Sequence, residues 1–394
     1  MGIENSTYKI LILDLIGLKF DAQGKPDPSE VKTHIEAKGG VFHNGAQRDN
    51  EILTAEKLHF FYQPELSTAT EILGITAQGQ YDAVIAAATI IPKESVFKFG
   101  GVRIGAGTGN MGSHSWGGGS GVSGVAPLMN TPSFNSRATA QMVFKALLKV
   151  RPNLPVGVLH ARVVAGDFDT GRNLREYPTE KLEGKKFAII GFGNIGGEVA
   201  RIAKVFGMKV SIFARSHRKA EIEAQGFEYA STMIEAARGA DVLSVHVGLG
   251  GFDAAASNYA NAGLIDQTIL NAMNHDAVLI NYDRGELVNI ADLDRALSTG
   301  QIGYAAIDAD LFKVETTGAL SGPMLPYIDL AKRHRGKLEL LPHAAADTDH
   351  PSRVAGAKQA IDQIFDCILL KRLTNLKGSL PEGYVNAGSK TAFN

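Results

Sequence analysis

The stretch AIIGFGNIGGEVA, residues 188–200, contains the spacing G-x-G-x-x-G at Gly191, Gly193 and Gly196. In a strand–turn–helix unit the first glycine makes a tight turn, the second lets the backbone approach a pyrophosphate, and the third lets the helix pack against the strand. A glycine-rich turn without a ligand is the alternative interpretation. Because the motif lies between an apolar run and a helical pattern, it favours dinucleotide binding.

A helix is expected directly after these glycines. Asn194 and Ile195 begin it, so their N–H groups are the ones that a pyrophosphate would meet. Apolar residues then recur at the spacing of one helical face, at Ile195, Val199, Ile202, Ala203 and Phe206. The pattern predicts a helix that packs on a sheet.

Short apolar runs alternate with helix-length segments from residue 185 to residue 343. The runs are KFAII, KVSIFA, DVLSVHV, AVLINY, YAAIDA and LELLP. Continuous apolar strands separated by helices are typical of a parallel sheet that is buried on both faces. The sequence therefore predicts an α/β fold with a doubly wound Rossmann sheet.

The first hundred residues show a weaker form of this alternation, with strand candidates YKILILD, YDAVIAA and GVRIGAG. The segment 352–373 reads as a long amphipathic helix that can return the chain to this first domain. A chain of 394 residues is long enough for two domains. We predict a smaller flavodoxin-like domain, residues 1–136 and 352–394, and a dinucleotide-binding Rossmann domain, residues 137–351.

The charges of the chain nearly balance, with 40 Lys and Arg residues against 41 Asp and Glu residues. No overall field therefore draws the chain to nucleic acid or to an anionic membrane, and no apolar run reaches the ~18 residues of a spanning helix. Cys367 is the only cysteine, which excludes an internal disulfide framework and a cysteine-based metal cage. We expect a cytoplasmic protein without a metal site and with neither a nucleic acid nor a membrane as partner.

The stretch SIFARSHRK, residues 211–219, lies where a nucleotide-binding unit usually places an acid for a ribose hydroxyl. Ala214 stands at that position, and polar or cationic residues follow it: Arg215, Ser216, Arg218 and Lys219. An acid would repel a 2′-phosphate, whereas arginine can hold a phosphate with two parallel hydrogen bonds. The stretch predicts NADP as the coenzyme, with NAD as the alternative; a solvated basic loop is the interpretation without a ligand.

Two polar residues stand at the carboxyl ends of predicted strands, Arg284 in LINYDRGELVN and His343 in LELLPHAAADT. Ligands of a doubly wound sheet bind beyond those ends. Reduction of a carbonyl by a nicotinamide needs a proton donor for the developing alkoxide, and a small anionic substrate needs a cation. Arg284 and His343 fit these roles; a salt bridge within a turn and a capped strand end are the interpretations without chemistry.

Seven stretches follow one another in a distinctive order: RIGAGTGNMGS, MNTPSFNSRATAQMVFKALL, LEGKKFAIIGFGNIGGEVARIAKVFGMKV, ADVLSVHVGL, GLIDQTILNAMNHDAVLINYDRGELVN, ALSTGQIGYAAID and LLPHAAADT. In order and spacing they resemble the D-isomer-specific 2-hydroxyacid dehydrogenases, over roughly residues 100–370. The resemblance implies a catalytic domain completed by a C-terminal helix, an inserted coenzyme domain, and an active site in the cleft between them. It also implies a homodimer formed through the coenzyme domains.

Matched motif by motif, the resemblance gives Arg284 the substrate carboxylate and carbonyl oxygen and makes His343 the acid/base. It places His246 and Asp308 beside the coenzyme, with a structural role favoured for His246. The stretch FARSHRK is similar to the phosphate-binding loop of the family's NADP-using glyoxylate and hydroxypyruvate reductases.

The resemblance also concerns the first domain. Asn110 and Gly107 lie in the family's cleft-lining stretch, and the loop 87–90 would lie near the substrate carboxylate. The loop WGGGSGVSGV, residues 116–125, has no close counterpart, so we expect it to shape the cleft or the surface toward a partner subunit. Gln141 replaces a glutamate that is common in the family, which bears on domain packing.

One departure concerns the catalytic histidine. The family usually places a glutamate five residues after Asp308, where it orients the histidine and raises its pKa. Lys313 stands at that position. Because the segment from Asp308 to His343 is longer than usual, we expect Glu315 or Asp310 to serve instead, and we favour Glu315.

The leading hypothesis is a D-stereospecific hydride transfer between NADP(H) and a small 2-oxo or 2-hydroxy acid, of the glyoxylate or hydroxypyruvate reductase kind. The missing glutamate keeps a second hypothesis open, a dinucleotide-sensing protein that has lost the chemistry, although Arg284 and His343 argue against it. The unusual segment DADLFKVE keeps open a third, a dehydrogenase of another small anion such as formate or phosphite.

Overall fold

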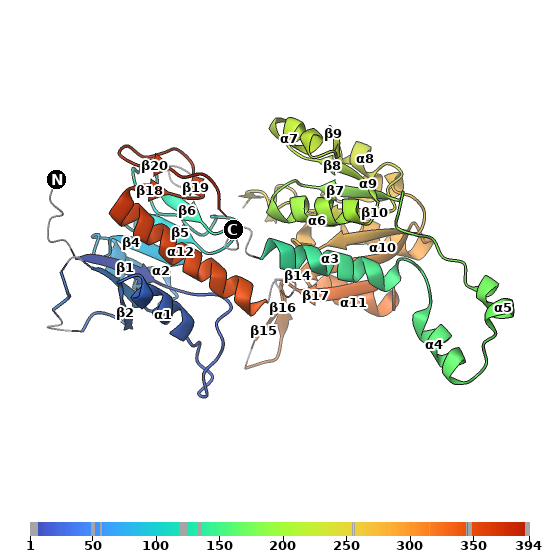
Figure 1. Cartoon of the computed structure of the whole chain (residues 1–394), viewed down its shortest axis with the longest axis horizontal. Helices are drawn as coiled ribbons and strands as arrows, with labels where there is room; N and C mark the ends of the chain where they lie inside the picture. The colour runs from blue at the N-terminus through green and yellow to red at the C-terminus, as the bar shows by residue number, and fades with distance from the viewer. Residues whose placement is uncertain are drawn as a thin grey trace. The chain divides into compact units, whose positions relative to one another are not determined.

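The computed structural model describes residues 7–48, 52–55, 57–117, 124–132, 135–253, 255, 257–314, 316–343, 345 and 349–390. The chain divides into two compact units, labelled in Figure 1 by their helices and strands. Unit 1 comprises residues 1–136 and 348–394, and unit 2 comprises residues 137–347.

Unit 2 is built on a seven-stranded sheet in the order β9-β8-β7-β10-β13-β14-β17, and all of its strand pairs are parallel. The strands are β7 (Lys186–Ile190), β8 (Lys209–Phe213), β9 (Glu228–Ala230), β10 (Val242–Val245), β13 (Ala277–Asn281), β14 (Ile302–Ala309) and β17 (Leu338–Pro342). The strand order reverses beside β7, as in a doubly wound dinucleotide-binding fold. The predicted Rossmann sheet is confirmed.

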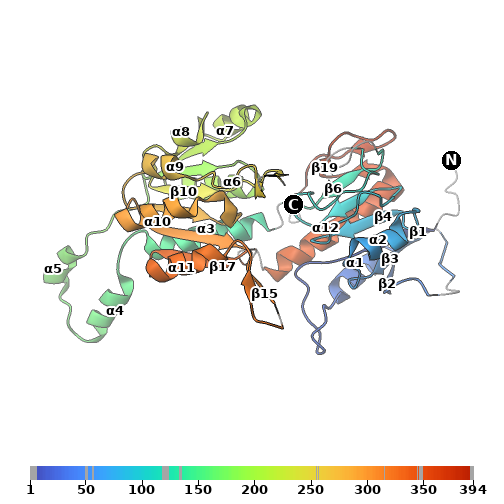
Figure 2. The ribbon, with the colours of Figure 1, turned by 180° about the vertical axis from the view of Figure 1, so that it is seen from behind.

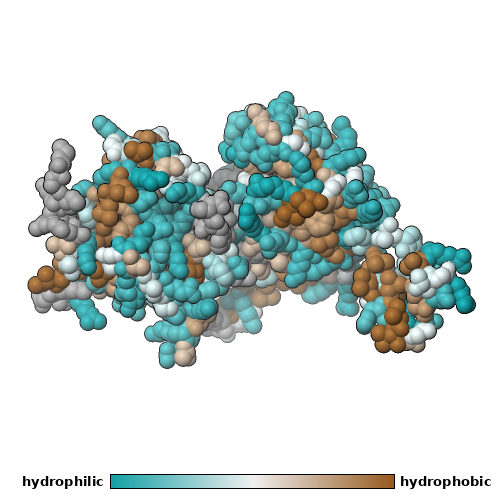
Figure 3. All heavy atoms as spheres, viewed as in Figure 1, coloured by the Kyte–Doolittle hydropathy of each residue, from teal (hydrophilic) through white to brown (hydrophobic). Residues whose placement is uncertain are grey.

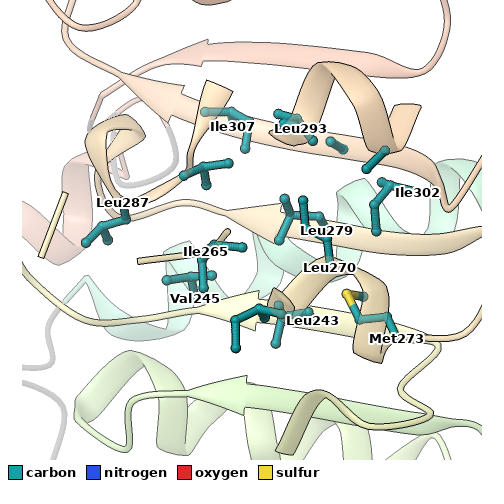
Figure 4. Packing of buried hydrophobic residues seen from close by; sticks show 14 of the residues in the cluster. Leu243, Val245, Ile265, Leu270, Met273, Leu279, Leu287, Leu293, Ile302 and Ile307 are labelled. Carbon is teal, nitrogen blue, oxygen red and sulfur yellow. The ribbon is translucent and has the colours of Figure 1, made fainter. Parts of the chain in front are cut away.

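Helices cover both faces of this sheet. They are α3 (Ser136–Val150), α6 (Asn194–Val205), α7 (Lys219–Ala224), α8 (Met233–Ala237), α9 (Gln267–Ala272), α10 (Ile290–Thr299) and α11 (Leu325–Arg333). Along β7, Phe187 and Ile189 pack with α3, α6 and α7, whereas Ala188 and Ile190 pack with α8 to α11. Figure 4 shows the second layer, where Leu243 and Leu279 of the sheet meet Leu270 of α9. Successive side chains of a strand point to opposite faces of the sheet, and helices bury both faces. The strand sequences are therefore unbroken apolar runs.

Unit 1 contains a second seven-stranded sheet, in the order β2-β3-β1-β4-β5-β6-β19. Its strands are β1 (Tyr8–Ile12), β2 (Val41–Asn44), β3 (Leu58–Tyr62), β4 (Ala83–Ala86), β5 (Gly101–Arg103), β6 (Leu128–Asn130) and β19 (Leu376–Lys377). The first six are parallel to their neighbours, and β19 runs antiparallel to β6. Without the edge strands β2 and β19, the order is 2-1-3-4-5, which is the order of the flavodoxin-like fold, the fold that the sequence predicts for this domain.

Among the described residues of unit 1, the helices are α1 (Ser29–Ala37), α2 (Ala69–Thr76) and α12 (His350–Leu370). Ile35 of α1 and Ile361 of α12 pack on one face of the sheet, and Ile72 of α2 packs on the other. The long helix expected over 352–373 is α12, which Asp349 caps by accepting the Ser352 N–H. It packs in the core of unit 1, the first domain to which the sequence assigned it.

Short elements connect these layers. In the part of the chain that the structure describes, short strands pair as β11 (Phe252–Asp253) with β12 (Asn258–Tyr259), β15 (Phe312–Lys313) with β16 (Leu320–Ser321), and β18 (Arg372–Leu373) with β20 (Val385–Asn386). Of the glycine-rich loop 116–125, residues 118–123 lie outside the described residues. Trp116 is buried, stacks on Phe97 and donates its indole N–H to the Met111 carbonyl at 2.9 Å. The start of this loop is therefore part of the core of unit 1.

A helical arm leaves unit 2 between α3 and β7. It carries α4 (Val156–Val164) and α5 (Thr170–Asn173), which stand away from the sheet of unit 2 in Figures 1 and 2. Neither helix has a buried residue, and Val163 and Val164 are 60% and 73% exposed. Figure 3 shows hydrophobic side chains gathered over this arm. Within the described part of the chain, no helix is both long and apolar enough to cross a membrane.

Candidate coenzyme and catalytic site

The glycine turn after β7 is closely packed at two of its three glycines. Gly191 has a φ of +101°, and a Cβ there would lie 2.2 Å from the carbonyl oxygen of His246. A Cβ on Gly196 would lie 2.2 Å from the carbonyl oxygen of Gly191. Only glycine fits at either position. The first and third glycines of the motif are therefore required by the turn itself.

The second glycine faces open space. Gly193 is the N-cap of α6, no side chain caps the helix, and a Cβ at Gly193 would have no atom within 4 Å. Asn194 is exposed and Ile195 partly exposed at the start of this helix. An uncapped helix N-terminus with space above its glycine suits a pyrophosphate, because the helix N–H groups and the helix dipole both favour an anion. The turn thus fits a dinucleotide.

His246 follows β10 and lies against this turn. Its imidazole is buried, and Nε2 lies 2.8 Å from the hydroxyl of Ser244. Burial lowers the pKa of His246 to about 3, so the ring is neutral. Among the described residues, its buried Nδ1 has no hydrogen-bond partner. Its backbone contact with Gly191 is consistent with the structural role that we favoured.

The cations after β8 are not equivalent. Arg215 and Ser216 are exposed at the start of a short 3-10 helix, η2 (Ser216–Arg218). Arg218 is partly buried: it donates to the Phe192 carbonyl at 2.9 Å, lies over the Phe192 ring, and pairs with Glu221 at 2.9 Å. Arg218 therefore ties this turn to the glycine turn, while Arg215 presents its charge to solvent.

Arg284 lies beyond the carboxyl end of β13 as predicted. It is the N-cap of a 3-10 helix, η3 (Gly285–Leu287), and its carbonyl accepts the Asn281 amide at 2.7 Å. Its guanidinium Nη1 lies 3.0 Å from Oδ2 of Asp310, and the two side chains are 37% and 31% exposed. The pair is open enough for a ligand to reach the guanidinium, which Asp310 holds in one orientation.

His343 follows β17, and its backbone N–H donates to the Ala309 carbonyl at 2.9 Å. Its Nδ1 lies 3.4 Å from Oδ1 of Asp308, a carboxylate that is almost completely buried. This interaction with Asp308 raises the pKa of His343, while burial raises the pKa of Asp308. The arrangement holds the imidazole by Nδ1 and leaves Nε2 for a substrate.

The carboxylates are distributed differently from our expectation. The carboxylate of Asp308, which the resemblance placed beside the coenzyme, contacts the catalytic-histidine candidate His343. Asp310 pairs with Arg284 instead of the histidine. Glu315, which we favoured as the partner of His343, lies outside the described residues. Lys313 is exposed in β15.

A further acid escaped the sequence analysis. Asp283 directly precedes Arg284, and burial together with the nearby Asp308 raises its pKa to about 7. Two carboxylates in one poorly solvated site do not readily ionise together. The signal for it was the acid inside NYDRG, which carries no spacing pattern of its own.

Two predicted segments of unit 1 meet within that unit. The amide of Asn110 donates to the carbonyls of Ala87 and Thr89, at 3.3 and 2.8 Å. Gly107 is exposed, and a Cβ there would have no atom within 4 Å. Asn110 therefore positions the 87–90 loop. Among the described residues, no group of three or more His, Cys, Asp and Glu side chains could hold a metal ion.

These features define an α/β dinucleotide-binding protein with an Arg/His/Asp cluster at the ends of its strands. The model of the family described as "D-isomer specific 2-hydroxyacid dehydrogenase, NAD binding domain" matches residues 155–338. The glyoxylate reductase of Aeropyrum pernix is 30% identical over 268 residues, which cover 65% of this chain and 68% of that protein. The chain belongs to the D-isomer-specific 2-hydroxyacid dehydrogenase family, and its coenzyme is a nicotinamide dinucleotide.

Solved structures agree in fold. An acyclic imino acid reductase in complex with NADPH and D-Arg has a TM-score of 0.60 at 19% identity, with 93% of this chain and 99% of that one covered. An NADPH-dependent glyoxylate/hydroxypyruvate reductase from Sinorhizobium meliloti, in complex with NADP and malonate, has a TM-score of 0.56 at 20% identity, with 95% and 98% covered. At such identities the likeness shows the shared two-domain architecture alone.

Proposed function

We propose that this protein reduces a small 2-oxo acid to the D-2-hydroxy acid with NADPH, with glyoxylate and hydroxypyruvate as the first candidate substrates. The observation that carries the proposal is the grouping in unit 2 of an accessible arginine, Arg284, with a histidine, His343, whose Nδ1 is held by Asp308. The name of the relative from Aeropyrum pernix supports glyoxylate as a substrate.

The coenzyme would be held by the glycine turn and by the start of α6. Gly191 and Gly196 shape the turn, and Gly193, Asn194 and Ile195 offer backbone to the pyrophosphate. When bound, the coenzyme supplies the hydride. Unit 2 is thus the coenzyme domain of our proposal, and unit 1 is the substrate domain.

Arg284 binds the carboxylate and the carbonyl oxygen of the acid, because a guanidinium offers several N–H donors in one plane. Asp310, whose Oδ2 lies 3.0 Å from Nη1 of Arg284, keeps that plane in one orientation. His343 donates a proton from Nε2 to the oxygen that gains charge during reduction. Asp308 raises the pKa of His343 and so favours the protonated ring that the reductive direction requires.

The preference for NADP rests on the turn after β8. Ala214 leaves no acid that would repel a 2′-phosphate, and Arg215 and Ser216 are exposed beside it. Arg218 contributes by fixing the turn against Phe192. The Sinorhizobium meliloti reductase, whose structure is a complex with NADP, supports the same choice.

We also propose a homodimer formed through unit 2. The arm helix α4 has no buried residue and exposes Val156, Val163 and Val164. An apolar groove lined by Phe144, Leu148 and Ile202 lies on the same unit. Burying both apolar surfaces against a second copy would stabilise the arm. Light scattering on the purified protein should give twice the chain mass of 41.9 kDa, and a monomer would contradict this.

The test of the proposed function is the oxidation of NADPH, beside NADH, with glyoxylate, hydroxypyruvate, pyruvate and bulkier 2-oxo acids. Turnover that favours NADPH supports the proposal, and the best substrate shows which side chain of the 2-oxo acid the site accepts. NADPH binding without turnover of any 2-oxo acid would sink it and would favour the dinucleotide-sensing alternative or another small anion.

A further inference from the structure

The strand ends that carry Arg284 and His343 also carry three carboxylates. Asp283 lies two residues after β13, Asp308 is the last residue but one of β14, and Asp310 directly follows β14. Two of these acids have a cationic partner. Oδ2 of Asp310 lies 3.0 Å from Nη1 of Arg284, and Oδ1 of Asp308 lies 3.4 Å from Nδ1 of His343. These two pairs balance each other in charge when the imidazole is protonated.

Asp283 is the acid in excess. Its backbone N–H donates to Oδ1 of Asn281 at 3.3 Å, but within the described part of the chain its carboxylate forms no ion pair. The next residues pack tightly against the end of β14, since a Cβ on Gly285 would lie 2.6 Å from the Cβ of Ala309 and 3.3 Å from the carbonyl oxygen of Asp308. This packing keeps Asp283 close to a second carboxylate.

The groups that act on Asp283 come from three strand ends. Burial and the carboxylate of Asp308 raise the pKa of Asp283 to about 7, against the opposing effects of the neighbouring Arg284 and of His343 after β17. Asp310 contributes indirectly, because it offsets the charge of Arg284. An acid with this pKa is partly protonated at neutral pH, so a new charge nearby changes its protonation.

An acid that binds Arg284 brings such a charge. Its carboxylate adds a negative charge next to Asp283, in a site that already holds one acid more than its cations balance. Like charges in a poorly solvated site do not readily remain ionised together. Asp308 and Asp310 are stabilised as carboxylates by their partners, so Asp283 is the group that should take a proton.

We propose that Asp283 takes up a proton from the solvent when an acid binds at Arg284, which makes Asp283 a specificity-determining residue whose protonation controls the affinity for anions. In the protonated form Asp283 tolerates the anion, and in the ionised form it repels the anion. The affinity for acids should therefore be highest below the pKa of Asp283 and fall as the pH rises through it. The inference deepens the proposed function, because it rests on the binding of an acid at Arg284.

The test measures the binding of oxamate to the full chain with excess NADPH. Oxamate carries a carboxylate and a carbonyl oxygen, as a 2-oxo acid does, but its amide carbonyl is not reduced by NADPH. Titration calorimetry in two buffers of different ionisation enthalpy gives the number of protons taken up per oxamate bound. Because a bound anion also favours the protonated form of His343, the share of Asp283 is the difference between wild type and Asp283→Asn.

The matched control is Asp276→Asn. Asp276 precedes the amino end of the same strand, its side chain is 64% exposed, and it pairs with Arg151 at 2.6 Å. The substitution removes the same charge from the opposite end of β13. Proton uptake in this variant should equal that of wild type.

At pH 8 we expect wild type to take up about half a proton more per oxamate than Asp283→Asn does. The two proteins should bind oxamate equally well at pH 6, whereas Asp283→Asn should bind it about tenfold more tightly at pH 9, because its amide is uncharged at every pH. A structural role alone would weaken binding equally at each pH. Equal proton uptake, or affinities that depend on pH in the same way, would overturn the proposal. If Asp283→Asn does not fold, Asp283→Ser replaces it, with the same expectations.

The inference and the proposed function fail in different ways. Proton uptake that depends on Asp283, without reduction of any 2-oxo acid, would support the inference and contradict the proposed function. Reduction of 2-oxo acids, with equal proton uptake in wild type and Asp283→Asn, would overturn the inference alone. Oxamate that binds at no pH would also overturn the inference.

Discussion

The two sheets of this protein treat the same topological position in opposite ways. In unit 2 the reversal point beside β7 is open, because Gly193 leaves space above an uncapped helix N-terminus. In unit 1 the reversal point between β1 and β4 is filled by the carboxylate of Asp14. The comparison teaches that a fold offers a ligand position, while individual side chains decide whether it is accessible.

The largest effect should come from His343, the proposed proton donor of unit 2. His343→Gln removes the proton donor, so we expect kcat to fall by about 10²- to 10⁴-fold, the usual contribution of general acid catalysis. NADPH affinity should not change. The matched control is His275→Gln, since His275 is an exposed histidine near the amino end of β13. A fall of kcat below tenfold in His343→Gln would remove the histidine from the mechanism.

The openness of the glycine turn can be tested with two neighbouring glycines of α6. Gly196→Ala forces a Cβ to 2.2 Å from the Gly191 carbonyl oxygen, so the turn must shift and NADPH affinity should fall about tenfold or more. Gly197→Ala is the control, because its Cβ would meet nothing closer than the Phe192 ring at 3.9 Å. Equal affinities of the two variants, measured by fluorescence titration, would show that the turn does not bind the coenzyme.

The proposed coenzyme preference depends on Arg215, an exposed cation in the turn after β8. Arg215→Ser should weaken NADPH binding by about ten- to a hundredfold, the value of a hydrogen bond to a charged group, and leave NADH unchanged. Arg172→Ser, which removes an exposed arginine of the arm, is the control. Parallel losses for both coenzymes, measured by titration calorimetry, would exclude a 2′-phosphate contact at Arg215.

A smaller change is expected in the pH profile of reduction. The interaction with Asp308 raises the pKa of His343, so reduction should be fully active below that pKa and decline as the pH rises through it. Asp308→Asn removes the charge, lowers the pKa of His343, and moves the alkaline limb of kcat/KM toward lower pH. An alkaline limb that stays in place would mean that Asp308 does not set this pKa.

The sequence predicted the glycine turn beside β7 in unit 2 much better than the position between β1 and β4 in unit 1. The glycine spacing and the unbroken strands of unit 2 were readable because burial on both faces and close backbone approach restrict residue choice. The sheet of unit 1 was found only as a weaker alternation, and Asp14 was missed, since an acid after a strand has no distinctive spacing.

The partners of the proposed catalytic side chains could not be predicted for a related reason. Arg284 and His343 were located because they lie just beyond the carboxyl ends of β13 and β17. Which carboxylate contacts which of them depends on side-chain geometry, and the structure pairs Asp308 with His343 and Asp310 with Arg284. The usual family offset leads to Lys313, and the longer segment made us favour Glu315, which lies outside the described residues, so that choice stays a prediction.

The most direct test of the central claim, that unit 2 reduces a 2-oxo acid through Arg284, is the rate of NADPH oxidation with glyoxylate in wild type and in Arg284→Ala. NADPH affinity is measured on the same samples. We predict turnover in wild type and its loss in Arg284→Ala, with equal NADPH affinity, because the acid loses its cation while the glycine turn is untouched. Turnover retained by Arg284→Ala would contradict the account.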